Sequence, residues 1–133
     1  MSDLEAQARK IAQSMARLVD EAVKITTLEI QYELKRSTPV DTGHARSNWV
    51  PSVGAPARGE EPGSGGAAQA AGEASIAGYK ATAGSAYISN NVPYIQRLDQ
   101  GHSLQAPTGF VRQSVTRGTR KAQAKINARA KRL

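Results

Sequence analysis

The sequence predicts an α+β fold, in which a long N-terminal helix packs on a small antiparallel β-sheet and a basic helix ends the chain. Residues 2–38 contain no Gly or Pro and repeat apolar side chains at helical spacing. The middle of the chain contains short segments of alternating apolar and polar residues between Gly and Pro clusters. With 133 residues the chain fits a single domain, 1–133.

The first helix has a clear start. Ser2 and Glu5 form a capping box, in which each side chain satisfies a free backbone N–H. The helix should run to about Lys35, about 50 Å at 1.5 Å per residue. Its apolar stripe is Leu4, Ala8, Ile11, Met15, Leu18, Ala22, Ile25, Leu28 and Tyr32, and a solvated face should hold Glu21, Lys24, Glu29 and Glu33. The stripe is expected to pack on the protein's own sheet, with a coiled-coil seam to a neighbouring subunit as the alternative.

A turn should follow at residues 38–43. Pro39 disfavours helix at the residue before it, Asp41 and Thr42 can bond nearby backbone N–H groups, and Gly43 can take a left-handed conformation. Asp-Thr-Gly also forms the catalytic loop of aspartic proteases. A preceding helix is the wrong context for that loop, so we interpret the triplet as a turn.

The middle of the chain should form the sheet. A strand is expected to begin near Arg46, with Trp49 as its apolar anchor, and a long Gly/Ala/Pro-rich loop should cover about residues 51–74. The loop lacks the Gly-Lys-Ser/Thr of a phosphate-binding loop. Segments 75–83 and 86–90 should pair as a hairpin, placing Tyr79 and Tyr87 on one face with Trp49 against the long helix.

The last third of the chain is rich in turns. Pro93 should end a strand, and 94–98 should form a short helix closed by Gly101. An extended segment then leads through Pro107 to a turn at Gly109. The basic helix should extend from Phe110 to about residue 131, with Gly118 as a weak point.

Positive charge is concentrated in that last helix. Residues 1–99 hold 10 basic and 11 acidic groups, whereas residues 100–133 hold 8 basic groups and no acidic one. These basic residues are Arg112, Arg117, Arg120, Lys121, Lys125, Arg129, Lys131 and Arg132. Such a tail suits nucleic acid or an acidic protein surface, and a solvated helix end is equally compatible with it.

The composition argues against catalysis and cofactors. The chain has no Cys, which excludes disulfides and thiolate sites. Neither His44 nor His102 has a partner at metal-ligand spacing, and His102 beside Ser103 reads as a turn histidine. No cofactor, no enzymatic activity, no signal peptide and no membrane span are expected. Aromatic residues make up only 5% of the chain, so a small aliphatic core favours a protein stabilised by assembly.

Four motifs occur in the order in which they occur in a known family. They are Thr38-Pro-Val-Asp-Thr-Gly43; Arg46-Ser-Asn-Trp49 with Gly54-Ala-Pro56; Tyr87-Ile-Ser-Asn-Asn91 with Pro93-Tyr94; and Gly101-His-Ser with Gln105-Ala-Pro-Thr-Gly-Phe-Val111. Together they resemble the neck or tail-completion proteins of long-tailed bacteriophages, the HK97-type tail components. The resemblance covers about residues 28–115. It departs from the family pattern at Gln100 and in the long loop.

The resemblance implies a structural virion protein. It implies a ring of identical subunits, expected to be a hexamer, between the head-side connector or head-closure protein and the tail terminator or tail tube protein, with genomic DNA passing through. The proposed interface residues would be Pro39, Asp41, Thr42, Gly43, Trp49, Pro93, Tyr94, Gly101, His102, Ser103, Gln105, Pro107 and Gly109. The protein would be made in the host cytoplasm and reside in the virion neck. The alternative function is a small nucleic-acid-binding protein that uses its C-terminal helix.

Overall fold

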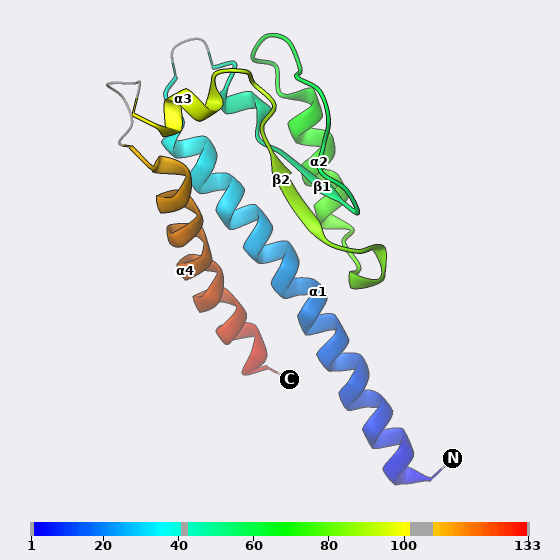
Figure 1. Cartoon of the computed structure of the whole chain (residues 1–133). Helices are drawn as coiled ribbons and strands as arrows, with labels where there is room; N and C mark the ends of the chain where they lie inside the picture. Colours follow the sequence, from blue (N-terminus) through cyan, green and yellow to red (C-terminus); the bar gives the residue numbers. More distant parts are fainter. Residues whose placement is uncertain (1, 41–42, 102–107, 133) are drawn as a thin grey trace.

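The computed structural model describes residues 2–40, 43–101 and 108–132. A long helix, α1 (Asp3–Ser37), runs the length of the molecule, and α4 (Phe110–Ala130) lies along its C-terminal half (Figure 1). The remaining elements are η1 (Arg46–Asn48), β1 (Val50–Val53), α2 (Ala67–Ala77), η2 (Ala81–Ala83), β2 (Ala86–Ser89) and α3 (Ile95–Asp99). The N-terminal half of α1 projects beyond the body that these elements form (Figure 1). The predicted α+β class is confirmed.

Helix α1 begins as predicted. The Glu5 N–H donates to Ser2 Oγ at 3.1 Å, and the Ser2 N–H donates to Glu5 Oε2 at 3.3 Å. The predicted contact with the sheet is present at β2, but the main neighbour of α1 is α4. The predicted solvated face is wrong at Glu33, whose side chain is fully buried against α4.

Small residues let α4 approach α1 closely. A Cβ on Gly118 would lie 2.6 Å from Ile30 Cα, so only glycine fits there. Ser114 and Ala122, one turn to each side, are buried in the same contact. Gly118, which the sequence marked as a weak point in the helix, is the position that allows the two helices to pack.

The sheet differs from the prediction in its bounds and its partners. The strand predicted to begin near Arg46 begins at Val50, because residues 46–48 form η1, and residues 51–53 belong to this strand and not to the predicted loop. Strand β1 pairs antiparallel with β2 in the register Val50↔Ser89 to Val53↔Ala86. The hairpin predicted between 75–83 and 86–90 is wrong, because residues 75–77 end α2 and residues 81–83 form η2. Tyr79 instead lies between them, and its hydroxyl donates to the Gly84 carbonyl at 2.7 Å.

The long loop also contains a helix that the sequence did not predict. Residues 67–77 form α2, which packs on β1. Gly72 allows this contact, because a Cβ there would lie 2.2 Å from the Pro51 carbonyl oxygen. The Ala68 N–H donates to the Glu61 carboxylate, which takes the place of a cap at Gly66. Alanine is the strongest helix former, so a neighbour that accepts the Ala-rich segment is enough to order it.

The core lies at the C-terminal end of α1. Leu34, Trp49 and Phe110 form its buried cluster. The Trp49 indole N–H donates to Thr38 Oγ1 at 2.7 Å, and the Thr38 hydroxyl donates to the Leu34 carbonyl at 2.6 Å. Trp49 is therefore an anchor, as predicted, and its indole also fixes the end of α1.

Candidate assembly surfaces

Most of the described motif residues lie near the C-terminus of α1 and the N-terminus of α4, where Trp49 and Phe110 share the buried core. Gly54-Ala-Pro56 and Tyr87 lie apart from them at the other end of the strand pair, where the Gly54 N–H donates to the Ser85 carbonyl at 2.8 Å. Trp49 is buried, whereas Pro93 and Tyr94 are exposed, with Tyr94 at 40%. Gly43 and Gly101 have φ of 81° and 92°, which glycine adopts without strain. The predicted interface residues Asp41, Thr42, His102, Ser103, Gln105 and Pro107 lie outside the described residues.

Asp99, which the sequence analysis did not single out, links the end of α3 to the start of α4. Its carboxylate accepts the Val111 N–H at 2.9 Å, and its carbonyl accepts the Gly109 N–H at 2.7 Å. Gly109 is the N-cap of α4 and has no side chain to satisfy the first N–H groups. Asp99 therefore acts as a cap from a separate helix. An acidic residue eleven positions before the first residue of a helix gives no recognisable local capping signal.

His44 connects the turn after α1 to the long loop. Its Nδ1 lies 2.6 Å from the Gly63 carbonyl oxygen, and its Nε2 lies 2.5 Å from Glu60 Oε2. The Glu60 carboxylate, followed by the Gly63 carbonyl, raises the pKa of His44 above its usual 6.5. Asn48 adds to this connection, because its amide donates to the Glu61 carbonyl at 3.0 Å and its Oδ1 accepts the Glu61 N–H at 2.9 Å.

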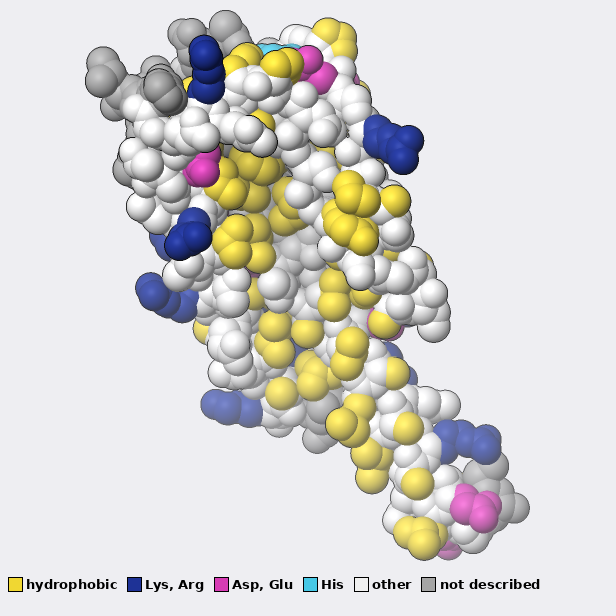
Figure 2. Space-filling view, in the orientation of Figure 1, with side chains coloured by type: hydrophobic (Ala, Val, Ile, Leu, Met, Phe, Trp, Pro, Cys, Tyr) yellow, Lys and Arg dark blue, Asp and Glu magenta, His cyan; other side chains and the backbone are white. Residues whose placement is uncertain are grey.

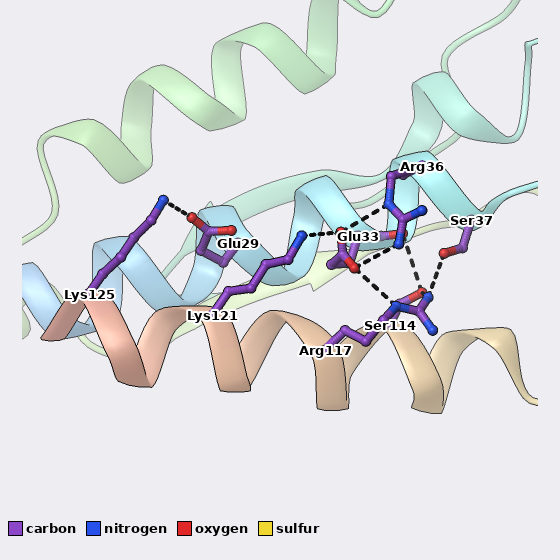
Figure 3. Close-up of polar contacts among 8 residues, drawn as sticks. All are labelled: Glu29, Glu33, Arg36, Ser37, Ser114, Arg117, Lys121 and Lys125. Atoms are coloured by element: carbon purple, nitrogen blue, oxygen red, sulfur yellow. Dashed lines mark hydrogen bonds and ion pairs between the residues drawn. The ribbon is translucent and has the colours of Figure 1, made fainter. Parts of the chain in front are cut away.

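Half of the basic tail turns inward to α1. Among the described residues, Arg117 and Lys121 pair with Glu33 at 3.0 and 3.1 Å. One turn earlier on α1, Glu29 pairs with Lys125. Figure 3 shows these pairs as a row of contacts between the two helices. Arg129 continues the row to Glu21 at 2.9 Å.

Glu33 is the centre of this row. Its side chain is 0% exposed, and Arg36 donates to both of its oxygens, in addition to the two cations of α4 (Figure 3). The hydrogen bonds from Arg36, opposed by burial and supported by Lys121 and Arg117, lower the pKa of Glu33 from 4.5 to about 2. The carboxylate is therefore an internal counter-ion that fixes α4 on α1.

The rest of the tail is available to a partner. Arg112, Arg120, Lys131 and Arg132 are exposed, and none of them makes an ion pair within the described part of the chain. The surface charge that the tail offers is therefore about half of what the sequence suggested. The other four cations of the tail are neutralised by Glu21, Glu29 and Glu33 of α1.

The projecting half of α1 carries an exposed apolar face. We call residues 3–19 the arm, and Leu4, Ala8, Ile11, Met15 and Val19 the arm stripe. Leu4, Ile11, Met15 and Val19 are 75%, 61%, 58% and 51% exposed. Steps of four and three residues place them on one side of the helix. Figure 2 shows apolar side chains running as a band from the body down the projecting half of α1. A row of large apolar side chains exposed on one helix face is typical of interaction surfaces.

The band continues into a groove on the body. Its floor is Thr26 and Ile30 of α1, and its walls are Ala86 and Ile88 of β2 and Val111 and Val115 of α4. The groove has a volume of about 340 Å³, and Ile30, Ile88 and Val111 are half-buried in it. Stripe and groove form one continuous apolar surface, because Ala22, Thr26 and Ile30 extend the same helical face.

No protein-family model, curated protein or solved structure matches the chain. No group of His, Cys, Asp and Glu suited to a metal ion occurs within residues 2–40, 43–101 and 108–132. None of the helices described is long and apolar enough to cross a membrane.

Proposed function

We propose that the protein is a structural subunit of a bacteriophage neck, which assembles into a homo-oligomeric ring that completes the tail. The ring would join the head-side connector to the tail terminator or tail tube, with DNA passing through it. The protein would act by binding its neighbours and would catalyse no reaction.

The exposed arm stripe is the observation that carries the assembly part of this proposal. A helix of an isolated domain normally turns its apolar face to the core, whereas residues 3–19 turn theirs to solvent. The neck location is supported by the four ordered motifs, most of whose described residues lie near the C-terminus of α1, where Trp49 and Phe110 share the core. The free cations on α4 suit a channel through which DNA passes.

The proposal is tested in phage particles and in solution. The protein should be present in purified virions, and an electron-microscopy label on it should lie at the junction of head and tail. Without the protein, filled heads and finished tails should accumulate unjoined. A protein that stays monomeric at high concentration and is absent from virions would contradict the proposal.

Nucleic-acid binding is the second candidate function, favoured by the exposed Arg112, Arg120, Lys131 and Arg132. The free subunit would then bind duplex DNA with an affinity that falls steeply with salt. Neutralising these four residues should abolish that binding, whereas neutralising Lys125 and Arg129, which pair with α1, should have a smaller effect.

A further inference from the structure

We propose that the arm of one subunit lies in the groove of the next subunit, and that this contact builds the ring. The inference rests on the proposed function, since it names the contact that a ring of identical subunits requires. The occupant of the groove is a second copy of this chain.

The two surfaces match in length and character. The arm is 17 residues long, about 25 Å at 1.5 Å per residue. The groove follows α1 from Thr26 to Leu34 and continues towards Ala22 through the adjoining hollow, which is lined by Tyr79 and Ala81. The segment of α1 from Ala22 to Leu34 is about 20 Å long at 1.5 Å per residue. Both surfaces are apolar, so docking removes both from water.

The arm of the same molecule cannot fill the groove. Helix α1 is continuous from Asp3 to Ser37 and contains no Gly or Pro at which it could fold back. Because stripe and groove belong to one straight helix face, the arm reaches a groove only on another molecule. One chain thus carries a projecting apolar helix and an apolar groove that its own arm does not reach.

The charges on the arm and beside the groove also support a second copy of this chain as the occupant. The tip of the arm is acidic, with Asp3 and Glu5 in the first turn of α1. Arg112, which is exposed and makes no ion pair among the described residues, follows Val111 at one end of the groove. Lys80, between Tyr79 and Ala81 at the other end, already pairs with Asp20 at 4.0 Å, so the acidic tip meets an unpaired cation where it lies beside Arg112.

Stripe and groove are separate segments of one apolar face of α1, and we take their contact between copies to be one-way, because that is the arrangement a ring requires. Each copy offers an arm to one neighbour and a groove to the other. Contacts of this kind continue from subunit to subunit until the ring closes.

The experiment uses two variants of the full chain and a matched control for each. Ile11→Glu with Met15→Lys places charges on the stripe, and this Glu-to-Lys spacing keeps the helix stable. Its control is Ala6→Glu with Gln13→Lys, on the opposite side of the helix. Val115→Glu blocks the groove from an exposed position, and Gln113→Glu is its control on the other face of α4.

Self-association is measured by sedimentation velocity, and circular dichroism checks that each variant is folded. Wild type and both controls should form a closed oligomer larger than a dimer. Each test variant should self-associate about 100-fold more weakly, because it loses apolar anchors of the interface. An equal mixture of the two test variants should form pairs and nothing larger, since one supplies the only intact arm and the other the only intact groove.

The other outcomes overturn the inference in distinguishable ways. If either folded test variant assembles like wild type, the docking contact is wrong and the proposed ring stands. If wild type stops at a dimer, the contact is mutual and the one-way assembly is wrong. If wild type is monomeric at every concentration, the proposed function fails together with the inference.

Discussion

Replacing Glu33 with Gln should destabilise the subunit strongly. The substitution keeps the shape of the side chain and removes its charge, which leaves Arg36, Arg117 and Lys121 facing one another without a counter-ion. A pKa lowered from 4.5 to about 2 corresponds to about 3 kcal/mol of stability at neutral pH. Since a domain has about 5–15 kcal/mol in total, urea unfolding followed by circular dichroism should resolve the loss easily.

The same reasoning predicts a pH dependence with a definite sign. The pKa of Glu33 is lower in the folded protein than in the unfolded chain, so its contribution is present above about pH 4.5. As pH falls towards 2, the carboxylate becomes protonated in both states and the contribution is lost. The difference in unfolding free energy between wild type and Glu33→Gln should therefore shrink from about 3 kcal/mol at pH 6 to near zero at pH 2.

Glu29→Gln is the control on the same helix. Glu29 pairs with Lys125, whose side chain is 61% exposed, so this substitution should cost less than about 1 kcal/mol. The reasoning is refuted if Glu33→Gln costs no more than Glu29→Gln at pH 6. It is also refuted if the difference between wild type and Glu33→Gln does not change between pH 6 and pH 2.

Three further predictions concern the packing around the core and the loop. Gly118→Ala should destabilise the protein by about 1–3 kcal/mol in urea unfolding despite the better helix propensity of Ala, because the new Cβ overlaps the α1 backbone. Thr38→Val should cost about 1–3 kcal/mol and shift the Trp49 fluorescence, since the buried indole N–H loses its acceptor. Glu60→Gln should lower the pKa of His44 towards its usual value in an NMR titration, because the carboxylate is the first cause of the raised pKa.

Each of these three predictions has a control variant or a pH test. For Gly118, the neighbouring exposed Thr119→Ala should leave the unfolding midpoint unchanged, and an unchanged midpoint in Gly118→Ala as well would contradict the close helix contact. For Thr38, Ser retains the hydroxyl and should restore the fluorescence. For His44, the raised pKa means that the Glu60 interaction stabilises the fold at low pH and is lost as pH rises through the folded pKa, so stability that rises with pH near neutrality would count against it.

The helices at both ends of the chain were predictable because local signals define them. The capping box at Ser2 and the unbroken periodicity gave α1, and the Pro-x-Gly turn with the spacing after Phe110 gave α4. Such signals act over a few residues, so a single sequence contains them. The pairing of β1 with β2 joins segments more than thirty residues apart, and no local pattern specifies that partner.

Helix α2 and the buried Glu33 were missed for the same physical reason. Alanine-rich residues 67–77 bury too little to hold a helix alone, and it is the contact of Gly72 with Pro51 that orders them. Glu33 has the spacing of a solvated residue and is buried only because α4 brings two cations to it. An excess of cations in the tail, facing a neutral body, was the one sequence signal of this pairing. The sequence showed the arm stripe as an apolar periodicity. Whether those side chains are exposed depends on how much of α1 the other elements cover, and no local pattern specifies that.

The projecting arm divides α1 into two regions with different folding equilibria. Forming the first turn is the costly step for an isolated helix, and residues 20–37, packed against α4, already supply that nucleus. The arm then extends residue by residue with its N-terminal capping box at the far end. Its amide hydrogens should therefore exchange with solvent through local fraying, whereas those near Leu34 exchange only when the whole subunit unfolds. One continuous helix can thus have protected amides at its C-terminal end and frayed, rapidly exchanging amides at its N-terminal end.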